Sequence, residues 1–186
     1  LNITPDSFSD GGMFLDFNAA LKRAEKMIEE GVDIIDIGGE STRPGSDAVS
    51  ADEELKRITP IIEAIKKISD IAISVDTYKP EVMKEVIDMD VAMINDIFAL
   101  QKPNAIDTIK KSNVGICLMH MQGTPKTMQL NPIYKNVVNE VKSFLEERVN
   151  LLTNEGIDKS RVILDPGFGF GKTFEHNIDL IQNIES

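Results

Sequence analysis

The chain has 186 residues, of which 41% are hydrophobic and 27% charged, a balance that suits one globular domain with a sizeable core. Its formal net charge of −11 argues against nucleic acid or an anionic membrane as a partner, and no run of about 18 apolar residues predicts a membrane span. The single cysteine, Cys117, lies in an apolar stretch and is expected in the core. Without a disulfide or an export signal, the sequence predicts a cytoplasmic protein.

Helices and strands alternate along the chain. Asn18 is the predicted N-cap of a first helix, and the apolar segment 32–39 follows as a strand. Ser50 and Glu53 predict a capping box at the start of the second helix, and Pro60 is expected to kink or break that helix. Further strands are predicted at 71–76, 91–96, 114–121 and 161–165, and further helices at 80–89, 104–112, 133–155 and 175–185.

This alternation predicts right-handed βαβ units and a parallel sheet. The carboxyl ends of parallel strands lie at one edge of a sheet, where the side chains that follow them meet. In this chain one apolar run after another ends at a polar residue, and we expect these polar residues to form one site. They are Asn2, Asp36, Asp76, Asn95 with Asp96, His120 and Asp165.

Three of these residues, Asp76, Asn95 and Asp165, offer two carboxylates and an amide that emerge from apolar walls. A carboxylate accepts two parallel N–H bonds, and an amide both donates and accepts, so the set suits a flat heterocycle with an amino-amide edge. Hard oxygen ligands of this kind also suit a metal ion, which is the competing interpretation. Each residue taken singly is equally explained as a helix cap or turn former.

Other polar residues carry less specific signals. Arg43 follows Thr42 on a glycine-flanked loop, where it could clamp an anion through two hydrogen bonds or simply lie in solvent. His120 stands between two methionines and is equally interpreted as a core residue, whereas His176 is expected at the surface. The segment that ends in Gly-Lys-Thr is no P-loop, because Pro166 stands where the first glycine of that motif belongs.

Six segments together resemble the dihydropteroate synthases of folate biosynthesis, a pterin-binding family, in both order and spacing. They are LNITPDSFSDGG, IDIGGESTRPG, SVDTYKP, MINDI, LMHMQGTP and ILDPGFGFGKT, and the likeness runs from residue 1 to residue 180. It implies an α/β fold, the TIM (β/α)8 barrel, incomplete here with strands 1 to about 6 present. Residues 1–186 are then one pterin-binding domain truncated at both ends, since Leu1 is no natural start and two later motifs of the family do not occur.

The resemblance implies a transferase that joins 4-aminobenzoate to 6-hydroxymethyl-7,8-dihydropterin diphosphate. The products are 7,8-dihydropteroate and diphosphate, Mg²⁺ is the cofactor, and the full-length protein is expected to be a homodimer. The Gly-Lys-Thr is then incidental, while Gly167 and Gly169 let the backbone approach the ring.

The resemblance also assigns site residues. Asp76 and Asp165 would be catalytic, since they would stabilise positive charge that develops on the pterin, and Asn2 would bind the metal. The residues assigned to the pterin diphosphate are Thr42, Asp76, Asn95, Met119, Asp165 and Gly169; those assigned to the aminobenzoate pocket and mobile loops are Phe8, Arg43, Pro44 and Phe170.

Two alternatives remain open. A methyltransferase that passes a methyl group from a methyl-folate to a corrinoid protein would use a similar pterin edge, but it would not need the TPDSFSDGG loop. An inactive, truncated pterin-binding module is the second alternative.

Overall fold

The computed structural model describes residues 1–3, 13–43 and 45–185, with only the backbone of residues 13–16. Its five strands are parallel and stand in chain order in one sheet: β1 (Ile34–Gly38), β2 (Ala72–Asp76), β3 (Met93–Asp96), β4 (Gly115–Met119) and β5 (Val162–Asp165). Asn2 forms an isolated parallel bridge to Gly38, so the end of a further strand lies beside β1. This order agrees with the incomplete barrel that the sequence predicts.

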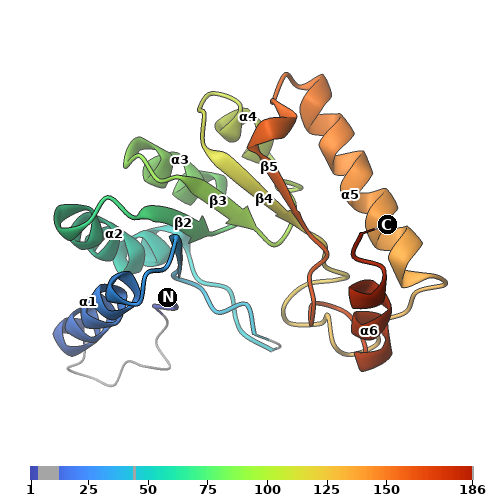
Figure 1. Ribbon diagram of the computed structural model, residues 1–186, viewed down its shortest axis with the longest axis horizontal. Coiled ribbons are helices and arrows are strands. Elements are labelled where there is room, and N and C mark those ends of the chain that lie inside the picture. Colours follow the sequence, from blue (N-terminus) through green and yellow to red (C-terminus); the bar gives the residue numbers. More distant parts are fainter. Residues whose placement is uncertain (4–12, 44, 186) are drawn as a thin grey trace.

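Six helices connect or follow these strands in the described residues: α1 (Met13–Glu29), α2 (Ala51–Ile68), α3 (Pro80–Asp88), α4 (Ala105–Ile109), α5 (Val137–Asn154) and α6 (Phe174–Gln182). A short 3-10 helix, η2 (Lys159–Arg161), precedes β5. Figure 1 shows α1 to α5 arranged in an arc around the sheet, while the loops that follow β1, β4 and β5 gather at one end of the strands. The fold therefore collects at that end the segments that the sequence pattern singled out.

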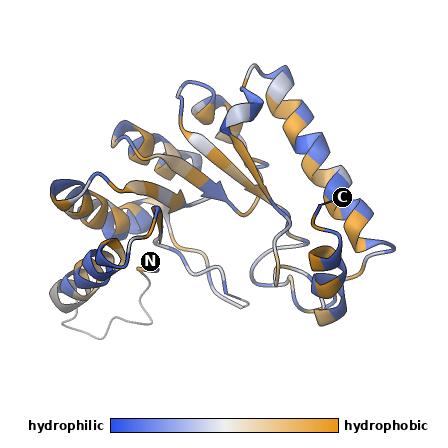
Figure 2. Ribbon diagram, viewed as in Figure 1, coloured by the Kyte–Doolittle hydropathy of each residue, from blue (hydrophilic) through white to orange (hydrophobic). Residues whose placement is uncertain are grey.

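The pleat of the strands separates an apolar row from a polar one. The apolar row packs against the helices and contains Ile35, Ile37, Ile73, Val75, Ile94, Ile116 and Leu118, all at most 3% exposed. Helix α2 adds Ile58, Ile61, Ile62 and Ile65 to the same core. Figure 2 shows this distribution as largely hydrophobic strands beside helices that are hydrophobic on one side and hydrophilic on the other. Cys117 is buried, as predicted.

Two predictions about the helices were wrong. Helix α1 begins at Met13, so Asn18 lies inside it rather than at its N-cap, because the apolar face continues to Phe17, which packs against the core. Helix α2 runs unbroken through Pro60, so the break expected there does not occur. The proline is on the exposed face, and the buried isoleucines on both sides of it hold the two halves of the helix against the sheet.

The predicted cap of α2 is half confirmed. The Ser50 side chain accepts a hydrogen bond from the Glu53 backbone N–H at 3.2 Å. The Glu53 carboxylate instead pairs with Arg57 one turn later, at 3.0 Å. In the part of the chain that is described, no helix is both long and apolar enough to cross a membrane.

Candidate functional site

The register of the sheet aligns polar side chains on the face opposite the helices. Asp76 is the partner of Asn95, and Asn95 is the partner of Cys117 on the next strand. Asp165 pairs with Met119, two residues beyond Cys117, and side chains two apart on a strand point the same way. The structure thus brings the predicted residues Asp76, Asn95, Met119 and Asp165 to one face at the carboxyl ends of four adjacent strands.

Asp36 joins this polar row from β1, where it pairs with Ser74, two residues before Asp76, although the sequence pattern assigned it no ligand. The Asn95 amide nitrogen lies 3.4 Å from an Asp36 carboxylate oxygen. The other oxygen of Asp36 and the amide oxygen of Asn95 are buried and have no hydrogen-bond partner among the described residues. Leaving such atoms unpaired costs about 1–3 kcal/mol each, so the pair is built to receive hydrogen bonds from a ligand. The signal was available, since Asp36 stands two residues before the strand end and so shares its face.

Burial changes the acid–base behaviour of Asp76. The pKa of Asp76 is raised to about 8. Loss of solvent contact is the main cause, and repulsion by the neighbouring Asp36 and Glu54 carboxylates adds to it. At neutral pH the ligand-free protein therefore holds this carboxyl mainly in its protonated form. The same burial raises the pKa of the Cys117 thiol to about 12, which leaves no reactive thiolate in the row.

Asn2 lies at the edge of the polar row. Its side-chain oxygen and one Asp76 carboxylate oxygen each lie 3.5 Å from the point where a Cβ on Gly38 would stand. Among the described residues, no group of three or more His, Cys, Asp or Glu side chains could hold a metal ion. An amide and a carboxylate oxygen fit Mg²⁺ nevertheless, because Mg²⁺ keeps several waters and commonly takes its other ligands from substrate phosphates.

The loop after β1 carries two of the predicted residues. Thr42 is half-buried and Arg43 is exposed. This loop contacts the loop after β4, where the Gly45 N–H donates to the Pro125 carbonyl at 3.2 Å. The predicted residues Phe8 and Pro44 lie outside the described residues.

The loop after β5 is held close to the end of β4. The Gly167 N–H donates to the Asp165 carboxylate at 2.7 Å, and a Cβ on Gly167 would stand only 2.0 Å from the His120 carbonyl oxygen. This part of the chain therefore requires glycine at 167. Gly169 donates its N–H to the Asn177 side chain at 2.8 Å, and Phe170 is half-buried beside it.

Lys172 is not incidental, so that prediction was wrong. Its buried ammonium lies 3.1 Å from His120 Nδ1, 2.9 Å from the Gly167 carbonyl oxygen and 3.0 Å from that of Phe170. Burial lowers the pKa of His120 to about 4, so the ring is neutral and accepts from the lysine. Of the two interpretations of His120, the core residue is therefore the right one. The sequence alone could not reveal its partner, Lys172, which lies 52 positions away.

Asp96 does not join the site, although it ends the same strand as Asn95. Its side chain points to the other face and accepts the backbone N–H groups of Phe98 and Leu100 at 2.8 and 2.9 Å. The Arg148 guanidinium binds the carbonyls of Ala99 and Leu100 at 2.8 and 3.0 Å. Asp96 and Arg148 together shape this turn.

The fold and the site agree with the comparisons to known proteins, and the chain belongs to the pterin-binding enzyme family, whose profile matches residues 1–186. It is 53% identical over 184 residues to the dihydropteroate synthase of Haemophilus influenzae, a match that covers 99% of this chain and 67% of the relative. The structure of Yersinia pestis dihydropteroate synthase with a sulfonamide drug superposes with a TM-score of 0.92 at 44% identity, covering 99% of this chain and 67% of that one.

A third relative, the dihydropteroate synthase of Xanthomonas albilineans with 4-aminobenzoic acid, superposes with a TM-score of 0.90 at 46% identity. The match covers 98% of this chain and 65% of that one. Another structure of the Xanthomonas enzyme contains 7,8-dihydropteroate. The chain thus spans about two thirds of the length of the relatives it matches.

Proposed function

We propose that the protein acts as a dihydropteroate synthase, which condenses 6-hydroxymethyl-7,8-dihydropterin diphosphate (the pterin diphosphate) with 4-aminobenzoate. The single observation that carries the proposal is the polar row of Asp36, Asp76, Asn95 and Asp165 on the face opposite the core. Support also comes from the relatives, which are named dihydropteroate synthases, and from the Xanthomonas enzyme, which holds 4-aminobenzoic acid or 7,8-dihydropteroate.

The polar row supplies the groups that a pterin needs. The amino-pyrimidinone edge presents N–H donors and a carbonyl acceptor in one plane, which carboxylates and an amide can pair. The Asp76 and Asp165 carboxylates would accept from that edge, while Asn95 would use its unpaired amide oxygen. Met119, buried on the same face, would lie against the ring.

The chemistry follows from charge. The bond between the pterin methylene carbon and the diphosphate oxygen breaks, and the diphosphate leaves with the bonding electrons. Positive charge then spreads over the pterin, where Asp76 and Asp165 would stabilise it in a site of low polarity. The neutral aminobenzoate amine forms the new C–N bond and loses a proton, so no strong enzymic base is needed.

The proposal includes Mg²⁺ near Asn2. Bound there, the ion would neutralise charge on the diphosphate and make it a better leaving group. Asn2 would supply an amide oxygen to the ion, and Thr42 would face the same phosphate end of the substrate. Arg43 would face the phosphate end as well and would border the aminobenzoate pocket, to which Phe170 would contribute.

Two further expectations, the location of the protein and its oligomeric state, do not depend on this site. A cytoplasmic location is part of the proposal, because the only cysteine of the chain is a free, buried thiol that suits a reducing compartment. The homodimer stays a prediction.

The activity is tested by incubating the protein with the two substrates and detecting 7,8-dihydropteroate by chromatography. We expect product that depends on both substrates and on Mg²⁺. Binding of both substrates without product would instead indicate an inactive pterin-binding module. Methyl transfer from a methyl-folate to a corrinoid protein would indicate the methyltransferase, an alternative that the names of the relatives disfavour.

A further inference from the structure

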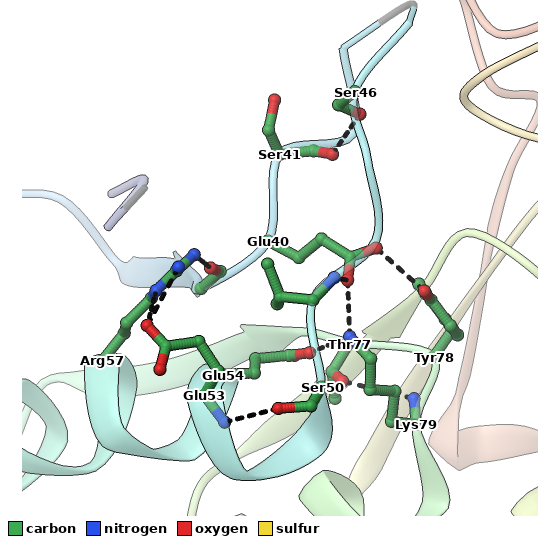
Figure 3. A network of polar contacts seen from close by, with 12 residues as sticks. Glu40, Ser41, Ser46, Ser50, Glu53, Glu54, Arg57, Thr77, Tyr78 and Lys79 are labelled. Carbon is green, nitrogen blue, oxygen red and sulfur yellow. Dashed lines mark hydrogen bonds and ion pairs between the residues drawn. The ribbon is translucent and has the colours of Figure 1, made fainter. Parts of the chain in front are cut away.

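A buried cluster of charged residues lies beside the polar row, at the base of the loop after β1. The Lys79 ammonium binds the carboxylates of both Glu40 and Glu54, and its distance to the Glu40 oxygen is 2.6 Å. All three side chains are nearly buried, since Glu54 is 1% exposed, Glu40 8% and Lys79 12%. They come from three different segments, namely the loop after β1, helix α2 and the turn that leads from β2 into α3 (Figure 3).

Glu40 also closes the loop on itself. One oxygen of its carboxylate accepts the Val49 backbone N–H at 2.8 Å, and the other accepts the Tyr78 hydroxyl at 2.9 Å. The two ends of the segment 40–49 are thus joined through one side chain, as in a compact surface loop with adjacent ends. We call these contacts of Glu40 with Val49, Tyr78 and Lys79 the neck clamp.

The backbone that leads from β1 to Glu40 is fixed as well. A Cβ on Gly39 would stand 2.8 Å from Ile58 and 3.0 Å from Glu54, so the chain passes directly over helix α2. The Arg57 guanidinium donates to the Gly39 carbonyl at 2.8 Å. The start of the loop is therefore held on α2 through Gly39 and on the turn after β2 through Glu40.

The neck clamp lies between the polar row and the loop residues Thr42 and Arg43. Tyr78 and Lys79 stand two and three residues after Asp76 on the β2 side, while Thr42 and Arg43 stand two and three residues after Glu40 on the loop. A salt-bridged carboxylate in this place fixes where the loop leaves the sheet relative to the polar row. An ion pair that is largely shielded from solvent and also hydrogen-bonded holds such geometry far more firmly than an exposed one.

We propose that the neck clamp positions Thr42 and Arg43 for the diphosphate end of the substrate, with Glu40 and Lys79 as positioning residues that do not contact the pterin ring. The inference rests on the proposed function for the identity of the ligand. The existence of the clamp itself can be measured without any ligand.

The test compares Glu40→Ala with the conservative Glu40→Gln. Glu40→Ala removes the acceptor of the Val49 N–H but leaves Lys79 paired with Glu54, so the fold keeps a balanced buried pair. Glu40→Gln keeps an acceptor oxygen for Val49 and should restore much of the effect. Glu155→Ala is the matched control, because Glu155 also pairs with a lysine of another element, Lys110 at 3.1 Å, on the exposed surface.

Two readouts separate a positioning role from a merely structural one. In the ligand-free protein, hydrogen exchange of the Val49 amide should accelerate about tenfold or more in Glu40→Ala, less in Glu40→Gln and not at all in the control. Titration calorimetry should show affinity for the pterin diphosphate falling about tenfold in Glu40→Ala. Affinity for 6-hydroxymethyl-7,8-dihydropterin, the same ring without diphosphate, should change less than about threefold.

Each outcome decides the matter. Unchanged exchange at Val49 would refute the clamp, and equal losses of affinity for both ligands would refute the positioning role. If Lys79→Met folds, it should reproduce the Glu40→Ala pattern, and wild-type affinity for the diphosphate in that variant would also overturn the proposal. A wild-type protein that binds neither pterin would refute the proposed function instead, and the exchange data would still decide the clamp.

Discussion

The Lys172 ammonium lies 3.1 Å from Nδ1 of His120, so a buried cation joins the end of β4 to the loop that follows β5. The same ammonium binds the carbonyl oxygens of Gly167 and Phe170. It thereby fixes the loop that leads away from Asp165, one of the residues proposed to hold the pterin.

Replacement of Lys172 by Met should destabilise the protein by about 2–4 kcal/mol, because the buried imidazole and carbonyls lose their donor. Urea unfolding followed by circular dichroism measures the change. Lys159→Met, at an exposed lysine of η2, is the control and should stay within about 0.5 kcal/mol of wild type. Equal stability of the two variants would contradict a structural role for Lys172.

Two glycines of the same loop should respond differently to alanine. Gly167 has φ of +69° and leaves no room for a Cβ, whereas Gly169 has φ of +80° with nothing within 4 Å of a Cβ. We expect Gly167→Ala to cost more than about 3 kcal/mol and Gly169→Ala about 1–2 kcal/mol, the strain of the backbone alone. Thermal unfolding of both variants measures the difference, and the reverse order would show that the contact with His120 is wrong.

The raised pKa of Asp76 makes stability depend on pH. The folded protein holds this proton up to about pH 8, whereas the carboxyl has an ordinary pKa of 3.8. Since the folded state binds the proton more tightly, its stabilisation is complete below about pH 4 and is lost as the pH rises through about 8. Between about pH 4 and pH 8 the free energy of unfolding of wild type should therefore fall relative to that of Asp76→Asn. Parallel pH profiles of the two proteins would contradict the raised pKa of Asp76.

Binding of a pterin should release a proton from Asp76. The ring N–H groups favour the carboxylate form, so ligand binding at neutral pH converts a mainly protonated carboxyl into an ionised one. Calorimetry in buffers of different ionisation enthalpy should show release of close to one proton in wild type and much less in Asp76→Asn. Proton uptake by wild type would contradict this account.

Loss of the Asp76 charge should also slow the reaction. Asp76→Asn keeps the shape of the side chain but cannot stabilise positive charge on the pterin, so turnover should fall roughly 10²-fold or more. Steady-state assay of dihydropteroate formation measures the effect, with Asp158→Asn at an exposed position as the control. Near-normal turnover would remove Asp76 from the proposed mechanism.

Much of this architecture could be predicted from the sequence because it depends on local patterns. Alternating apolar strands and amphipathic helices predict the parallel sheet, and a polar residue at each strand end predicts the edge where Asp76, Asn95 and Asp165 meet. Strand pairing then fixes their common face through the period of two, without any detail of packing.

The missed features depend on contacts between distant residues. Nothing in the sequence around Lys79 indicates that its ammonium meets Glu40, 39 positions away. The same holds for Lys172 and His120. Pro60 misled for the opposite reason, since packing on the far side of α2 outweighed a local helix-breaking signal. The roles of individual site residues and the limits of the domain remain predictions.

The central claim is that the face bearing Asp76, Asn95 and Asp165 holds a flat bicyclic ring. A crystal structure of the protein soaked with 7,8-dihydropteroate tests it most directly. The account predicts the amino-pyrimidinone edge within about 3.2 Å of side-chain atoms of all three residues. A pterin bound elsewhere, or bound here with these three side chains turned away from it, would contradict the account.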